Sequence, residues 1–156
     1  MGSEFGQGDE WNHDKQLDWY VLQYPLHQGI KQLVGDLNRL YTGQDALHHF
    51  DFDHDGFEWI SCHDTDQSVL SYLRKVGDKT IIVVLNFTPV VRSDYKIGVP
   101  MAGNYKILLN SDSAFYSGSN TGSGGVLTAT TETWMDRPAS LRLELPPLAG
   151  LVLINQ

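Results

Sequence analysis

The stretch SLRLELPPLAGLVLI, residues 140–154, indicates the fold class of this chain more clearly than any other part. Leu141, Leu143 and Leu145 alternate with polar residues, so one face of an extended segment is buried and the other meets water. The two prolines that follow interrupt the ladder, because proline has no amide hydrogen to donate. An apolar run over 151–154 then resumes the pattern. The stretch therefore predicts two strands separated by a proline break.

Shorter segments of the same kind extend back along the chain as far as Phe57. They are rich in β-branched and aromatic residues, and turn residues such as Gly, Pro, Asn and Asp separate them. The expected strands cover residues 57–63, 69–75, 80–87, 95–99 and 105–109. No helical pattern alternates with strands in this part, which excludes a parallel sheet there. The chain is therefore predicted to be mostly β, with an antiparallel β-sandwich.

One amphipathic helix is expected before the β-rich part, between Gln28 and Tyr41. Its apolar residues recur at the spacing of one helix face; they are Ile30, Leu33, Val34, Leu37, Leu40 and Tyr41. Gly43 is the expected stop, with a further short turn over 44–49. The first nineteen residues show neither periodicity and are expected to form an extended loop. A single helix depends on packing of its apolar face, so it needs a partner.

Composition and charge limit the partners of the chain. Its 156 residues fit one domain plus a short attached segment, and 41% of them are hydrophobic, enough for a core. The formal net charge is −8 with no cluster of basic residues, which argues against nucleic acid and anionic membranes. No apolar run is long enough to span a bilayer, and no signal peptide is expected after Met1. The single cysteine, Cys62, fits a reducing compartment, so a cytoplasmic location is expected.

Neither a metal nor a cofactor is expected. The run 51–56, DFDHDG, resembles the start of a calcium loop, but Cys62 occupies the twelfth position, where an EF-hand has a bidentate glutamate. The histidines do not match zinc-site spacing, and the glycine-rich run 117–125 lacks the lysine of a phosphate-binding loop. His63 is the only neighbour that could activate Cys62, but adjacent strand residues point to opposite faces.

Eight ordered motifs carry a resemblance to a known family across essentially the whole chain. They are MGSEFGQ, EWNHDKQLDW, GIKQLVGDLNRLY, DFDHDGFEW, DTDQSVLSYLRK, VVLNFTPV, LNSDSAFYSGSN and LELPPLAGLVL. With these motifs the chain resembles the C-terminal portion of bacterial 1,4-α-glucan (glycogen) branching enzymes of the α-amylase superfamily. The alternative within that superfamily is another enzyme, such as a debranching or trehalose-forming one; EWNH followed by LDW favours branching.

The resemblance implies a division of the chain into two parts. Residues 1–49 correspond to the end of a (β/α)8 catalytic barrel, with its last strand, a loop and the closing helix, and residues 50–156 to a C-terminal β-sandwich. The catalytic carboxylates of such enzymes lie on earlier barrel strands. No catalytic residue is therefore expected here, and the chain alone is expected to be inactive. The expected partners are an α-glucan and the rest of the barrel in the parent chain.

The best candidate for a glucan contact is Trp59, because sugar rings stack on exposed aromatic faces. Asp53, Asp55 and Glu58 lie within six residues of it and could bind sugar hydroxyls. The alternative role of Trp59 is packing between domains.

Four loop residues are further candidates, because the resemblance places their loop at the active-site face of the parent: Glu4, Gln7, Trp11 and Asn12. The alternative for these is loop packing. Trp19 and Trp134 are expected to be structural.

Two alternatives from other functional classes stay open. One is a stand-alone carbohydrate-binding module, which would bind glucan without a barrel. The other is a purely structural domain, which would bind none. If the apolar stripe of helix 28–41 finds no partner within the chain, self-association through that stripe is expected.

Overall fold

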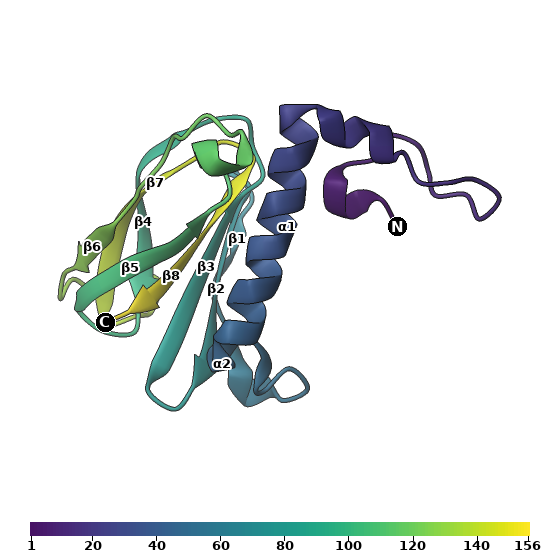
Figure 1. Cartoon of the computed structure of the whole chain (residues 1–156). Helices are drawn as coiled ribbons and strands as arrows, with labels where there is room; N and C mark the ends of the chain where they lie inside the picture. Colours follow the sequence, from purple (N-terminus) through teal and green to yellow (C-terminus); the bar gives the residue numbers. More distant parts are fainter.

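The computed structural model describes residues 1–156 and contains eight strands in two antiparallel sheets, as the alternating pattern predicts. The strands are β1 (Phe57–Asp64), β2 (Val69–Val76), β3 (Lys79–Asn86), β4 (Arg92–Val99), β5 (Gly103–Asn110), β6 (Val126–Ala129), β7 (Ala139–Leu145) and β8 (Ala149–Asn155). The large sheet has the order β1-β2-β3-β8-β5-β6, and the small sheet pairs β4 with β7 (Figure 1). The predicted antiparallel β-sandwich is therefore confirmed.

The main core lies between the two sheets. Leu141, Leu143 and Leu145 of β7 are buried there, on the face that their alternation predicts. Tyr105 of β5 and Leu73 of β2 meet them from the large sheet. The small sheet consequently has one buried face and one face in contact with water.

A second, smaller core lies on the outer face of the large sheet. There α1 (Pro25–Gly43) and α2 (Asp45–His48) cover part of the sheet (Figure 1). Leu33 and Leu40 of α1 pack against a buried cluster that includes Val83 and Val152. The expected helix thus starts three residues earlier than predicted and finds a partner for part of its apolar stripe within the chain.

The helix is fastened to the sandwich by the short 3-10 helix η4 (Ala114–Tyr116). The Tyr116 hydroxyl donates to a carboxylate oxygen of Asp36 at 2.8 Å, and the Ser117 hydroxyl donates to the Pro25 carbonyl at 3.1 Å. Gly29 faces this contact, because a Cβ built there would lie 2.1 Å from the Tyr116 carbonyl oxygen. Only glycine permits this close approach.

The N-terminal segment projects away from the sandwich beyond the end of α1 (Figure 1). It includes two 3-10 helices, η1 (Ser3–Phe5) and η2 (Trp19–Gln23). Phe5 is fully buried, with its ring 5.0 Å from that of Trp19, and its carbonyl accepts a hydrogen bond from His27 at 2.9 Å. The expected loop is therefore partly ordered by 3-10 turns, and no strand precedes β1.

Two local features differ from the expectations. Strand β6 lies directly after the glycine-rich run and was not predicted. A register shift in β1 between Ser61 and Asp64 brings the Cys62 sulfur to 3.5 Å from Nε2 of His63, so these neighbours do not point to opposite faces. A β-bulge has this effect because it interrupts the alternation of side chains.

None of the helices combines the length and apolar character needed to cross a membrane.

Candidate functional site

Trp59 lies on β1, at the edge of the large sheet, with 47% of the residue exposed. Its ring meets Phe57 edge-on at 4.9 Å and Tyr72 edge-on at 6.0 Å, as measured between ring centroids. Tyr72 faces Trp59 across the β1–β2 pair, and it also packs against the small core under α1 and α2. We call these three residues, Phe57, Trp59 and Tyr72, the aromatic edge.

An ion pair flanks the aromatic edge. Arg74 faces Phe57 across the strands, and its guanidinium lies 2.6 Å from a carboxylate oxygen of Asp51. The Tyr41 hydroxyl of α1 donates to the same carboxylate. Hydrogen bonds from Tyr41 and Arg74 lower the pKa of Asp51, so the carboxylate is ionised at neutral pH. A charged acceptor and a guanidinium donor thus lie beside three aromatic rings.

The carboxylates expected around Trp59 are engaged elsewhere. Glu58 points away from Trp59, as alternation along a strand requires, and pairs with Lys75 at 2.7 Å and Arg137 at 2.5 Å. Hydrogen bonds from Lys75 and then Arg137 lower the pKa of Glu58. Asp53 and Asp55 both contact the imidazole of His54, at 3.2 and 3.1 Å. The acidic partner on the side of the aromatic edge is Asp51, which lies farther back in the sequence.

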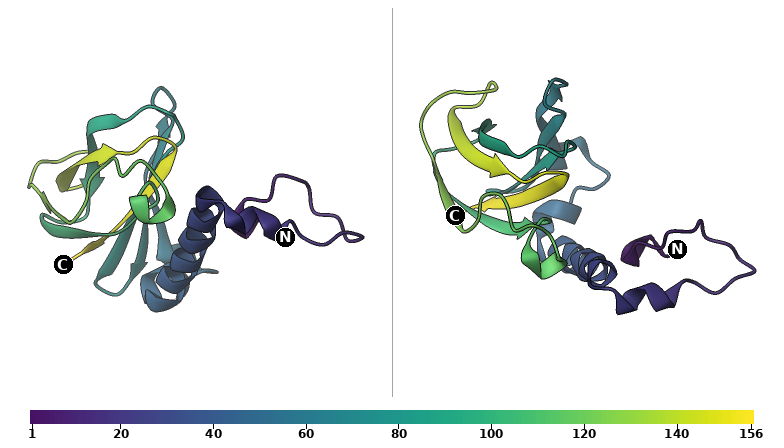
Figure 2. Two further views of the ribbon diagram at one scale, coloured as in Figure 1. Left: turned by 45° about the horizontal axis from the view of Figure 1, so that its top comes forward. Right: turned by 90° about the horizontal axis from the view of Figure 1, so that it is seen from above.

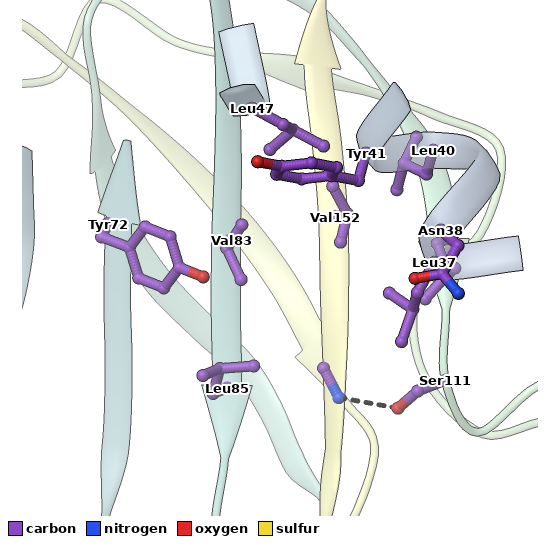
Figure 3. Close-up of a pocket in the computed structure, with 12 residues that line it drawn as sticks. Leu37, Asn38, Leu40, Tyr41, Leu47, Tyr72, Val83, Leu85, Ser111 and Val152 are labelled. Atoms are coloured by element: carbon purple, nitrogen blue, oxygen red, sulfur yellow. Dashed lines mark hydrogen bonds between the residues drawn. The ribbon is translucent and has the colours of Figure 1, made fainter. Parts of the chain in front are cut away.

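A groove begins at Tyr72 and runs between α1 and the large sheet, with a cavity volume of about 430 Å³ (Figure 3). Nine of its twelve lining residues are hydrophobic. The lining comprises Leu37, Asn38, Leu40, Tyr41, Leu47, Tyr72, Val83, Leu85, Leu109, Ser111, Gly150 and Val152. The Ser111 hydroxyl accepts a hydrogen bond from the Gly150 amide at 2.9 Å, drawn as a dashed line in Figure 3. The groove extends the aromatic edge with a mostly apolar surface and few polar groups.

The four loop candidates lie apart from Trp59, on the projecting N-terminal segment (Figure 1). Gln7 and Asn12 line one polar depression of about 250 Å³, whereas the exposed residues Glu4 and Trp11 do not line it. The Gln7 side chain donates to the Asp9 carbonyl and accepts from the Asp18 amide, and Asn12 accepts from the Asp14 amide. These bonds hold the loop in shape. The structure thus brings two of the five candidates together.

Sequence reasoning missed three members of this surface, Tyr72, Arg74 and Asp51. The spacing of Phe57 and Trp59 already places those two rings on one face of a strand. The others join them through the register of β1 on β2 and through the turn after α2, which a single sequence does not reveal.

Comparisons with known proteins agree on one family. Residues 59–156 match the family model described as "Alpha amylase, C-terminal all-beta domain". The chain is 54% identical over 153 residues to the 1,4-alpha-glucan branching enzyme GlgB of Nitrosococcus oceani, covering 98% of this chain and 20% of that protein. It is 57% identical over 152 residues to the protein of the same name from Cereibacter sphaeroides, covering 97% and 21%. The chain therefore spans about a fifth of the length of these relatives.

A solved structure supports the fold alone. A cyclomaltodextrin glucanotransferase with a three-domain ABC distribution superposes with a TM-score of 0.55 at 17% identity, covering 95% of this chain and 25% of that one. The similarity extends over the helix as well as the sandwich, because nearly the whole chain is covered.

Proposed function

Since this chain belongs to the α-amylase C-terminal all-beta domain family, we propose that it is the non-catalytic C-terminal part of a 1,4-α-glucan branching enzyme. About 50% identity over nearly the whole chain to relatives of that name supports the proposal. The parent would cleave an α-1,4 linkage through a covalent glycosyl intermediate and transfer the segment to a 6-hydroxyl, with two carboxylates that lie outside this chain. Residues 1–49 would then complete the barrel, and residues 50–156 would form the accessory sandwich.

The role proposed for this chain is to hold a glucan chain beside the barrel. The observation that carries it is the aromatic edge, where the Trp59 ring is half-exposed next to the ion pair of Asp51 and Arg74. Sugar C–H faces stack on aromatic rings, and charged groups hydrogen-bond the hydroxyls. A purely structural ring would be expected to be buried more completely.

The test is to replace Trp59 with alanine and to measure maltoheptaose affinity and the urea midpoint side by side. We expect binding to weaken by roughly 1 kcal/mol or more, because one stacking partner is lost. The loss of stability should stay below the roughly 3–5 kcal/mol typical of a fully buried ring. Tyr20→Ala is the matched control, because Tyr20 is an exposed aromatic residue on η2, outside the aromatic edge. Unchanged affinity in Trp59→Ala together with a collapsed midpoint would favour the structural alternative.

Other parts of the proposal concern the parent protein. The loop residues Glu4, Gln7, Trp11 and Asn12 would shape glucan subsites at its active-site face. A cytoplasmic location is proposed because the one cysteine is free. This chain alone would leave amylose uncleaved, which an iodine-stain assay at high protein concentration measures.

Self-association of the isolated chain is proposed from the part of the α1 stripe that the sheet leaves uncovered. The exposed residues of this stripe are Ile30, Leu37 and Tyr41. Exposed apolar surface of this kind favours association between copies. Light scattering over a range of concentrations measures it, and a monomer at every concentration would refute it.

A further inference from the structure

Trp134 occupies a fixed position over the outer face of the small sheet. Its backbone pairs with Arg137 through two hydrogen bonds of 3.1 and 2.9 Å, and Met135 and Asp136 between them both have positive φ. This is the geometry of a tight two-residue hairpin. The hairpin packs directly on β4, because a Cβ at Gly98 would lie 2.2 Å from the Trp134 carbonyl oxygen.

The indole of Trp134 is held rigidly but is not buried. Its Nε1 donates to the Lys96 carbonyl at 3.0 Å, and the Lys96 ammonium lies 4.4 Å from the ring centroid. The Lys96 side chain is only 10% exposed, whereas Trp134 is 43% exposed. The sequence predicts a structural role for Trp134. In the structure its backbone forms part of the hairpin, as a structural residue would, but its ring remains accessible to solvent.

Two ion pairs lie on the same outer face as the ring, one of them in contact with it through Lys96. Lys96 pairs with Glu132 at 2.5 Å, and Arg142, which faces Lys96 across the β4–β7 pair, pairs with Asp94. The Arg142 and Asp94 side chains are 57% and 66% exposed, so both retain free hydrogen-bonding capacity. We call Trp134 and these four charged residues, Lys96, Glu132, Arg142 and Asp94, the Trp134 patch; its two positive and two negative charges cancel. Such a surface offers donors and acceptors around an aromatic platform without attracting an ion, which suits a neutral polyhydroxylated ligand.

The location of this patch keeps it free in a larger protein. The small sheet and α1 lie on opposite sides of the large sheet (Figure 2). A barrel that extends from α1 would therefore lie on the α1 side of the large sheet, next to the aromatic edge, and leave the outer face of β4 and β7 in water.

We propose that the outer face of β4 and β7 holds a second surface site for an oligosaccharide. Trp134 is the stacking platform, and Arg142 and Asp94 bind hydroxyl groups. The ligand is a neutral α-glucan chain; this identification rests on the proposed function, whereas the site itself rests on the geometry of the patch.

The experiment uses the whole chain with maltoheptaose as the probe, and compares Trp59→Ala, Trp134→Ala and the double variant. Backbone amide shifts in NMR titrations report each surface separately. Trp134→Ala should move the shifts at Lys96 and Arg142 to higher maltoheptaose concentrations and leave those at Tyr72 unchanged. Trp134→Tyr should retain binding at the small sheet, because it keeps an aromatic face. The loss of affinity at the patch is expected to be about fivefold or more.

A second variant protects the test against loss of folding in Trp134→Ala. Arg142→Gln combined with Asp94→Asn removes an exposed pair whose contribution to stability is small, so the fold should persist while binding at the patch weakens. Affinity should not depend on salt, because the ligand is neutral.

The outcomes separate the two sites. Saturating shifts at Tyr72 with none at Lys96 or Arg142 would overturn the Trp134 site and leave the proposed function intact. Shifts at the small sheet without any at Tyr72 would support the Trp134 site and refute the role of the aromatic edge. If maltoheptaose shifts neither surface, both proposals are wrong.

Discussion

Replacing Gly29 with alanine tests how firmly α1 is attached to the sandwich. The new Cβ would lie 2.1 Å from the Tyr116 carbonyl oxygen and 2.5 Å from the carbonyl carbon. Both atoms belong to the backbone of η4, so no side chain can rotate away. The contact must widen by more than 1 Å to reach ordinary van der Waals separation, which means that α1 and η4 must move apart.

Three contributions set the expected size of the effect. Overpacking of this kind costs about 1–3 kcal/mol. Moving η4 away from α1 also weakens the hydrogen bonds Tyr116–Asp36 and Ser117–Pro25, each of which contributes about 1 kcal/mol. Alanine favours the helix over glycine by about 1 kcal/mol, which offsets part of the loss. With both hydrogen bonds lost, we expect a net destabilisation of about 2–4 kcal/mol.

Gly35 provides the matched control, because it lies in the same helix and is flanked by open space. Its Cβ would meet only the Arg39 guanidinium, at 3.8 Å. Gly35→Ala should therefore stabilise the chain by about 1 kcal/mol. Urea unfolding followed by circular dichroism gives both values, and hydrogen exchange shows whether the α1 amides lose protection. Equal stabilisation by the two substitutions would refute the close approach of α1 to η4.

Two further predictions concern single hydrogen-bonding groups. Burial, together with the hydrogen bond to Asp36, raises the pKa of Tyr116 to about 12. The stability that the neutral Tyr116 contributes is therefore present below pH 10 and is lost as pH rises towards 12. The difference in urea midpoint between Tyr116→Phe and wild type should shrink over that range, and a constant difference would contradict the assignment. Asn86 is 2% exposed, and its side-chain amide donates to the carbonyls of Val90 and Pro146. Asn86→Ala should lower the free energy of unfolding by about 2–4 kcal/mol, because it leaves these carbonyls unpaired. A decrease below about 0.5 kcal/mol would show that water replaces the amide.

The elements that could be predicted are those whose signal is local. The alternation of Leu141, Leu143 and Leu145 fixes both the strand and its buried face, and the helical spacing locates α1. Strand β6 could not be found, because its four residues follow a glycine-rich run and its only signal is pairing with β5. The position of α1 on the sandwich could not be predicted for the same reason, because it depends on the contact between Gly29 and η4, which lies more than eighty residues later in the sequence.

The candidate site follows the same division. Trp59 was found from a motif, and Phe57 is its neighbour by strand periodicity. Tyr72 and Asp51 join Trp59 only through the pairing of β1 with β2 and the ion pair to Arg74. Glu58, close in sequence, was expected to assist Trp59 but points to the opposite side and is held by Lys75. Proximity in sequence therefore pointed to the wrong carboxylate: Asp51, and not Glu58, lies on the same side as the Trp59 ring.

The two outer faces of the sandwich differ in what can cover them, and this difference decides how the two tryptophans of the sandwich, Trp59 and Trp134, can act. The large sheet presents Val83 and Val152 outward, so an apolar helix covers it and Trp59 lies at the border of that contact. The small sheet presents Lys96 and Arg142 with their acidic partners. Removing such charges from water costs several kcal/mol for each ion, so no apolar partner is favoured there. An exposed ring on that face is therefore suited to a ligand that remains largely hydrated, which is why Trp134 fits a sugar chain better than a protein interface.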